Sequence, residues 1–163
     1  MPYPFFPMMM NINGKEILIV GGGNVASRRA ETLLRCGAKI TAVSLNFSEN
    51  FPEVHKRIER AFKVEDIDEK FFFVLAATDD RETNKLIRDI ARSKKIPVNV
   101  CDCQEECDFF FPSLISVENV GVSVCTGGLD AKLTRRISDR LRKVLPKWLK
   151  EIRNEELNST PHS

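Results

Sequence analysis

The sequence predicts an α/β protein, in which a parallel sheet with crossover helices is followed by a hairpin and helices. Two observations support this prediction. Short apolar runs alternate with helical patterns as far as Pro112, which is typical of a parallel sheet. After Pro112, two short runs with alternating apolar residues precede a long helical pattern. We therefore expect two regions, residues 1–112 and residues 113–163.

The segment EILIVGGGNVASRR, residues 16–29, predicts a strand, a glycine turn and a helix. The apolar run fits a buried strand, and apolar residues recur at helical spacing after the glycines. Gly21, Gly23 and Ala26 match the G-x-G-x-x-A pattern of a dinucleotide-binding turn, in which the backbone approaches the pyrophosphate and the helix N-terminus holds it. The same pattern also joins strands to helices in proteins that bind no ligand, so other segments must decide between the two readings.

The remaining elements of the first region are those of a Rossmann-like sheet. A run that is nearly all apolar predicts a central strand covered on both faces. A short strand is also expected where RAFKV follows a polar amphipathic segment. The predicted strands after the glycine turn are 38–44, 60–64, 71–78 and 96–101, and a helix is predicted at about 81–93.

The second region predicts an antiparallel hairpin followed by helices. SLISV and VGVSVC flank Glu118 and Asn119, and the valines of the second run alternate with small residues. From Asp130 onward, apolar residues form a stripe at helical spacing, which Pro146 is expected to divide into two helices. Because an isolated two-stranded ribbon is not stable in water, we expect this region to form a homodimer.

Composition and charge exclude several classes of protein. The 163 residues carry a net charge of +2, which does not indicate a nucleic-acid partner or an anionic membrane. No apolar run approaches the roughly 20 residues of a membrane span. The start, MPYPFFPMMM, lacks the basic leader and cleavage site of a signal peptide and is expected to pack on the domain. We expect a soluble cytoplasmic protein with reduced cysteines.

The positive charge is concentrated near the C-terminus. Residues 132–153 contain nine Lys or Arg side chains and two acidic side chains. This pattern fits either a solvated helix face or a site for a polycarboxylate substrate. It favours nucleic acid least, because Trp148 is the one aromatic side chain there that could stack on bases.

The cysteines and histidines do not predict a metal site. Cys101, Cys103 and Cys107 have a spacing that differs from usual zinc sites, so we interpret them as incidental thiols. A soft-metal redox site built from them is the weaker alternative. His55 lies in a charged stretch expected to be helical and His162 in the tail, which argues against a Ser/His triad.

Four segments are expected to converge outside the carboxyl ends of the strands, where an open parallel sheet binds its ligand. Ser44 occupies the position where NAD-binding proteins usually carry an acid, so this position does not distinguish NAD from NADP. Asp79 could instead cap the following helix together with Glu82. Asp102 is as consistent with a turn as with catalysis. The four segments are Gly21–Gly23, Ser44–Asn46, Ala76–Asp80 (with Thr78 and Asp79) and Asn99–Asp102.

The ordered set VGGGNVASRR, AATDD, NVCD, CDFFFPSLI and VCTGG resembles the precorrin-2 dehydrogenase family, the dehydrogenase and chelatase module of siroheme synthase. The resemblance covers about residues 12–145. It implies NAD-dependent oxidation of precorrin-2 to sirohydrochlorin, with ferrous iron insertion in some members. It also implies a homodimer formed by the region from Ser113 onward.

The resemblance assigns roles to particular residues. The family's essential aspartate matches Asp102, which would accept a proton. Asp130 and Ala131 replace the Ser-Pro that commonly follows the family's Ser/Thr-Gly-Gly loop. Basic side chains near the loop would bind substrate carboxylates. The resemblance implies nucleotide contacts at Asn24, Val25, Leu45 and Asn46, and substrate contacts at Thr126, Gly127 and Gly128. The glycine turn and the strand ends add the expected cofactor contacts Gly21, Gly22, Gly23, Ser44, Thr78 and Asp79, and positive charge adds the expected substrate contacts Arg29 and Arg135.

A non-catalytic alternative is a nucleotide-sensing Rossmann module, which would use the same glycine turn and also dimerise. The motifs DFFFPSLI and CTGG favour the enzyme, because a sensor does not need this second set of residues. The resemblance therefore favours an NAD-dependent precorrin-2 dehydrogenase over the sensing module.

Overall fold

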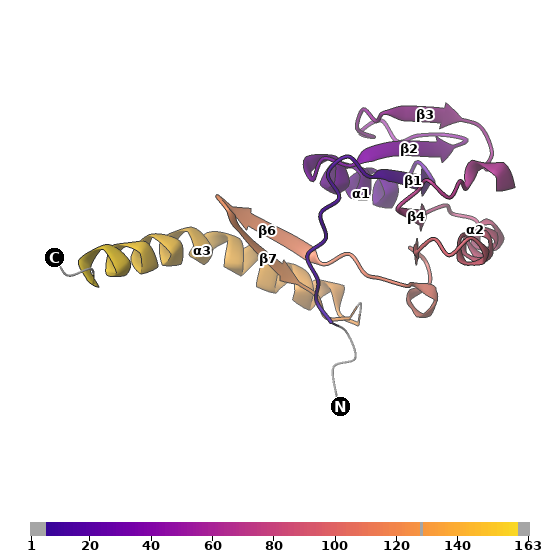
Figure 1. The fold of residues 1–163 in the computed structure, drawn as a ribbon. Helices are drawn as coiled ribbons and strands as arrows, with labels where there is room; N and C mark the ends of the chain where they lie inside the picture. The colour runs from indigo at the N-terminus through magenta and orange to yellow at the C-terminus, as the bar shows by residue number, and fades with distance from the viewer. Residues whose placement is uncertain (1–5, 128, 160–163) are drawn as a thin grey trace. The chain divides into compact units, whose positions relative to one another are not determined.

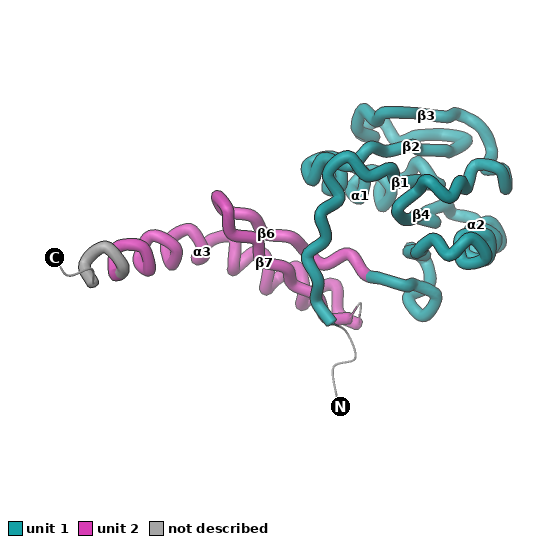
Figure 2. Tube along the Cα trace, in the orientation of Figure 1, with its two compact units in different colours: residues 1–109 teal, residues 110–163 magenta. Residues whose placement is uncertain are grey.

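The computed structural model describes residues 6–127 and 129–159. The chain forms two compact units, Met1–Phe109 and Phe110–Ser163, which Figure 2 distinguishes by colour.

The first unit contains a five-stranded sheet in the order β3-β2-β1-β4-β5, with every neighbouring pair parallel. Figure 1 shows the sheet with the helices beside it. This arrangement confirms the predicted Rossmann-like α/β fold. The strands are β1 (Glu16–Val20), β2 (Lys39–Ser44), β3 (Lys56–Glu59), β4 (Phe73–Ala76) and β5 (Val98–Val100); the helices are α1 (Asn24–Arg35) and α2 (Arg81–Ser93), with short 3₁₀ turns η1 (Val64–Asp66) and η2 (Gln104–Glu106).

The centre of the sheet forms the core of this unit. Ile17, Leu18, Ile19 and Val20 are at most 1% exposed, and the residues of β4 are buried as well. Burying one such aliphatic side chain contributes about 1.5–3 kcal/mol. Both faces of the central strands therefore need apolar side chains, which is why these segments read as continuous apolar runs.

The third strand differs from the prediction. It is formed by Lys56–Glu59, whereas RAFKV lies outside the sheet. β3 is an edge strand with one half-buried apolar residue, Ile58, so it carries no hydrophobic pattern. The helical stretch expected around His55 is also wrong, because His55 immediately precedes this strand.

The N-terminal segment does not pack as expected. Among its described residues, Phe6, Met8, Met9 and Met10 are 54–87% exposed. Its apolar composition led us to expect burial on the domain, and the structure corrects that expectation.

The second unit consists of an antiparallel hairpin and one long helix. The strands β6 (Ser113–Val117) and β7 (Val120–Val124) pair in a register that places Ile115 opposite Val122. Glu118 turns the chain with a positive φ of 53°. The helix α3 (Ala131–Ser159) packs against β6, and Arg142 Nη2 lies 3.5 Å from the Leu114 carbonyl oxygen.

Pro146 does not divide the C-terminal helix, contrary to the prediction. α3 continues through it to Ser159. Proline fixes φ near the helical value and removes one backbone donor, so the local cost is limited to the lost hydrogen bond and ring crowding. The neighbouring Leu145 is only 8% exposed, and its packing favours an unbroken helix. No helix in the described parts of the chain is long and apolar enough to cross a membrane.

Candidate functional site

The order in which the strands are placed in the sheet reverses at β1. β2 and β3 extend the sheet on one side of β1, and β4 and β5 extend it on the other. Val20 pairs with both Val43 and Ala76, and Ala76 pairs with Val100, so the strands end at one level. The segments that follow these strands therefore share one edge of the sheet, at the point where open α/β sheets bind ligands.

The three glycines of the turn serve different purposes. A Cβ on Gly21, whose φ is +124°, would lie 2.1 Å from the Ala77 carbonyl oxygen. A Cβ on Gly22 would lie 2.1 Å from the Asn46 carbonyl oxygen. A Cβ on Gly23 would meet nothing within 4 Å. Gly21 and Gly22 thus let the chain segments close on one another, whereas Gly23 borders open space into which a ligand can approach.

The N-terminus of α1 is suited to an anion. Gly23 is its N-cap, no side chain caps it, and its first turn contains no acidic residue. Asn24 and Val25, the first residues of the helix, are exposed. Backbone N–H groups at an uncapped helix start can donate to a phosphate, and the helix dipole favours the negative charge.

The start of α2 is capped, in contrast. Asp80 Oδ2 accepts a hydrogen bond from Thr83 N at 3.0 Å, and the hydrogen bonds from Thr83 lower the pKa of the Asp80 carboxyl. The predicted alternative role for Asp79 as the cap is therefore wrong by one residue. Asp79 itself is exposed beside this cap, at the edge of the sheet.

Thr78 is held in place by a buried asparagine that the sequence analysis missed. The Thr78 N–H and hydroxyl lie 3.1 and 2.7 Å from Asn84 Oδ1, and Asn84 Nδ2 donates to the Thr78 carbonyl at 3.1 Å. Asn84 is fully buried. A buried amide with these partners fixes the loop after β4. In the sequence, this role was indicated by a polar residue on the side of α2 that faces the core.

The loop after β2 closes against the glycine turn. The Ser44 hydroxyl donates to the Asn46 carbonyl at 2.6 Å, and Ser48 N donates to the Gly22 carbonyl at 2.8 Å. Leu45 and Asn46 are exposed at the tip of this loop. They are therefore accessible to a nucleotide bound over the turn.

Asp102 belongs to an ion-pair network. Its Oδ1 lies 3.3 Å from Arg81 Nη1, and Arg81 Nη2 lies 2.5 Å from Glu106 Oε1. Arg88 contacts the same Glu106 oxygen. Hydrogen bonding from Arg81 lowers the pKa of the Glu106 carboxyl and raises that of the Arg81 guanidinium. The Asp102 side chain is 35% exposed, so it can meet a ligand while one oxygen is held.

Arg29 provides positive charge near Asn99–Asp102. Burial lowers the pKa of its guanidinium. Arginine stays charged in proteins at neutral pH, so this half-buried side chain presents a cation close to the end of β5.

The cysteines near β5 are held as thiols. Desolvation raises the pKa of Cys101 to about 11, so it is protonated at neutral pH. Burial also raises the pKa of Cys107, whose sulfur lies 3.2 Å from the Val100 carbonyl oxygen. Among the described residues, no group of three or more His, Cys, Asp or Glu side chains is arranged to hold a metal ion.

The predicted substrate loop lies in the second unit. The Thr126 hydroxyl is 2.9 Å from that of Thr134, and Gly127 has a positive φ of 65°. Asp130 caps α3 by accepting from Leu133 N at 2.8 Å, which explains how it can replace the family's serine at this position. Arg135 is 85% exposed. Gly128 lies outside the described residues.

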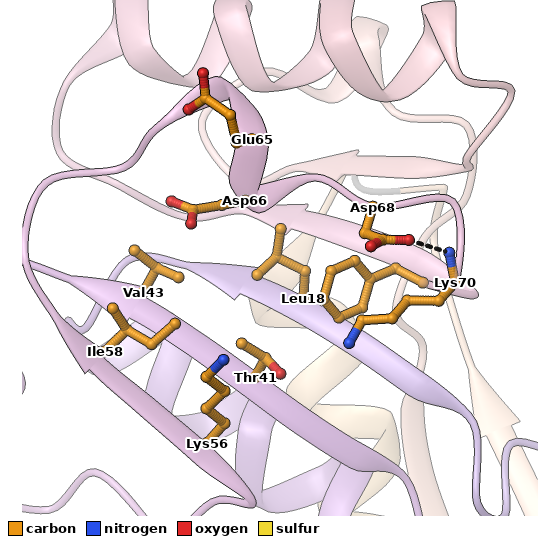
Figure 3. A pocket seen from close by; sticks show the side chains of 10 residues that line it. Leu18, Thr41, Val43, Lys56, Ile58, Glu65, Asp66, Asp68 and Lys70 are labelled. Atoms are coloured by element: carbon orange, nitrogen blue, oxygen red, sulfur yellow. Dashed lines mark hydrogen bonds between the residues drawn. The ribbon is translucent and has the colours of Figure 1, made fainter.

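A cavity of about 190 Å³ lies on the sheet (Figure 3). Thr41 and Lys56 line it from the strands, and Asp66 and Asp68 line it from the opposite segment. The Asp66 carboxylate is already bound by Arg60. The cavity has no lining residue in the glycine turn or in the loop after β2, so we do not assign the dinucleotide to it.

Comparisons with known proteins agree with this geometry. A family model described as "Putative NAD(P)-binding" matches residues 8–113. The chain is 36% identical over 149 residues to a "Probable multifunctional siroheme biosynthesis protein HemA" of Ruminiclostridium josui, and 36% identical over 147 residues to a siroheme synthase of Methylococcus capsulatus. The alignments cover 87% of this chain but 28% and 31% of the relatives, so the chain spans about a third of their length.

A solved structure also resembles this chain. The structure named "SirC, precorrin-2 dehydrogenase" has a TM-score of 0.72 and 27% sequence identity, and the match covers 85% of this chain and 70% of that chain. These similarities confirm the resemblance expected from the sequence motifs.

Proposed function

Because this chain belongs to the NAD(P)-binding family whose model it matches, we propose that it oxidises precorrin-2 to sirohydrochlorin with NAD+. The observation that carries the proposal is the glycine turn at the reversal of strand order. Gly23 borders open space there, and the start of α1 is uncapped. These features fit a dinucleotide pyrophosphate, and the proposed substrate follows from the named relatives.

In this reaction NAD+ supplies the hydride acceptor. The protein holds the pyrophosphate at the turn, with Asn24 and Val25 at the helix start. Leu45 and Asn46 border the adenosine side, and Thr78 and Asp79 border the edge of the sheet. The proposed catalytic residue is Asp102, which accepts the proton released as the hydride leaves precorrin-2. Arg81 holds one oxygen of this carboxylate, and the exposed part of the group remains available to the substrate.

Basic side chains would bind the carboxylates of the tetrapyrrole. Arg29 presents a cation near the end of β5, and Arg135 is exposed at the start of α3. Charge-assisted hydrogen bonds from arginine to carboxylates are among the stronger polar contacts. The loop of Thr126, Gly127 and Gly128 is included in this proposal on the basis of the family pattern alone.

The proposal includes a homodimer built from residues 113–163, with residues 1–112 as the NAD-binding domain. Support comes from apolar side chains of α3 that stay exposed in the single chain. Leu133, Ile137, Trp148 and Ile152 are 38–52% exposed. Exposed apolar stripes of this kind are typical of subunit interfaces. Ferrous iron insertion, a cytoplasmic location and the absence of a nucleic-acid partner stay predictions from the sequence.

The decisive experiment is anaerobic incubation of the purified protein with precorrin-2 and NAD+. We expect the absorbance of sirohydrochlorin and of NADH to rise together. A protein that binds NAD+ but forms neither product would favour the sensing module instead. Omitting NAD+ provides the control for spontaneous oxidation of the substrate.

A further inference from the structure

We infer that the ion pair between Arg57 and Glu59 makes the site select NAD+ over NADP+. The inference rests on the proposed function, because it concerns the choice of cofactor at the same site. The two cofactors differ only at the 2′ position of the adenosine ribose, which carries a hydroxyl in NAD+ and a phosphate in NADP+. Dinucleotide-binding proteins usually recognise this position with an acid at the end of the second strand, or with a nearby arginine.

Here the acid lies one strand farther out. Ser44 ends β2, and Glu59, which ends β3, is its register partner. Neighbouring strands are about 4.8 Å apart, and paired residues in a parallel ladder share a face of the sheet. The Ser44 hydroxyl lies 2.9 Å from the position of a Cβ on Gly22, so Ser44 borders the glycine turn. A ribose that extends from the turn past Ser44 therefore comes next to Glu59.

Arg57 is held beside this position by two neighbours. Its Nε and Nη2 donate to Glu59 Oε1 at 3.0 and 2.7 Å. Its guanidinium carbon lies 4.2 Å from the centre of the Phe47 ring. Phe47 is in turn close to the glycine turn, because its Cα lies 2.9 Å from the position of a Cβ on Gly22. The Arg57 guanidinium is therefore held near the turn. Two of its N–H groups already donate hydrogen bonds to the Glu59 carboxylate.

This pair favours a hydroxyl and disfavours a phosphate. Both hydrogen bonds from Arg57 end on Oε1, so Glu59 Oε2 can accept a hydrogen bond from a ribose 2′-hydroxyl. A 2′-phosphate would be repelled by the negative charge of the same carboxylate. Arg57, which could otherwise bind the phosphate, would already be hydrogen-bonded to Glu59. The side chains are 45% and 60% exposed, so both are accessible to a bound nucleotide.

The experiment measures the affinities of NAD+ and NADP+ by calorimetry for the wild type, Glu59→Gln, Arg57→Gln and the double variant. Glu31→Gln is the matched control, since it removes the same charge from an exposed site on α1, about 10 Å from the start of the helix. We expect the wild type to prefer NAD+. We expect Glu59→Gln to improve NADP+ binding about tenfold by freeing Arg57 for the phosphate. The double variant should lose this gain, and Glu31→Gln should keep the wild-type ratio.

The outcomes separate this inference from the proposed function. The inference is wrong if the wild type prefers NADP+, if Glu59→Gln leaves the ratio of affinities unchanged, or if the double variant keeps the gain. If neither dinucleotide binds to the wild type, the cofactor assignment fails, and the inference fails with it. Normal NAD+ turnover with an unchanged ratio would leave the proposed function intact and reject the inference alone.

Discussion

Arg81 Nη1 lies 3.3 Å from Asp102 Oδ1, so the first residue of α2 contacts the carboxylate that follows β5. Arg81 is itself held by Glu106, at 2.5 Å, and Glu106 is also contacted by Arg88. The orientation of the Asp102 carboxylate is therefore set by side chains from α2 and η2.

Asp102→Asn should slow the oxidation of precorrin-2 by roughly 10²–10⁴-fold in kcat, which is the usual contribution of a general base. The substitution preserves size and removes the proton acceptor. The affinity for NAD+, measured by titration, should change little because the glycine turn is untouched. A folded variant that turns over at the wild-type rate would show that Asp102 is a turn residue.

Arg81→Gln should lower kcat by up to about 10²-fold, because a misplaced catalytic group can cost that much. Arg81→Lys should recover part of the loss, since it keeps a cation near the carboxylate. Arg88→Gln is the matched control, because Arg88 contacts Glu106 but has no ion pair with Asp102. Steady-state kinetics with NAD+ and precorrin-2 varied separately would test this. A positioning role for Arg81 is excluded if both variants at position 81 have the kcat of the control.

The sequence predicts best those elements of the fold that depend on local residue patterns. The strand, glycine turn and helix from Glu16 to Arg35 were predictable because apolar periodicity and glycine spacing are both local properties. β3 was not predictable, since an edge strand with the sequence KRIE needs few apolar residues. The contact between Arg81 and Asp102 was also beyond the sequence, because it depends on how β5 and α2 are placed by the sheet.

Gly23→Val should weaken NAD+ binding by about tenfold or more, equivalent to about 1.4 kcal/mol. The branched side chain would fill the open space beside the turn, and the φ of −77° at this position suits any residue. The fold should therefore be unaffected. Titration with NAD+ and thermal unfolding would measure the two effects separately.

Gly21→Ala should give the opposite pattern. Its Cβ would collide with the Ala77 carbonyl, and its φ of +124° is unfavourable for alanine, so we expect a loss of stability of about 1–3 kcal/mol. Equal effects of Gly21→Ala and Gly23→Val on stability would contradict the distinction between the two glycines.

The stability of the first unit should depend on Asp66 at acidic pH. Hydrogen bonds from Arg60 lower the pKa of the Asp66 carboxyl. A carboxyl with a lower pKa in the folded state stabilises the protein above its unfolded pKa of about 3.9, and this contribution is lost as the pH falls through the folded pKa. Asp66→Asn should therefore lower the urea midpoint at pH 7. The difference from the wild type should shrink below about pH 4, and a difference independent of pH would contradict this assignment.

The proposed dimer depends on the exposed apolar side chains of α3. Ile137 is 38% exposed in the single chain, whereas Leu145 on the same helix is 8% exposed. An exposed apolar residue that packs against a second subunit can be changed to a charged one at little cost to the monomer. Ile137→Glu should therefore give a folded monomer by light scattering at micromolar concentration, where the wild type should be a dimer.

Leu145→Ala provides the contrast for this test. It removes buried side-chain volume within the second unit and should cost about 2–5 kcal/mol of stability. Its main effect should appear in the unfolding transition rather than as a folded monomer. If the wild type is already monomeric, or if Ile137→Glu remains a dimer, the exposed stripe of α3 is not the subunit interface.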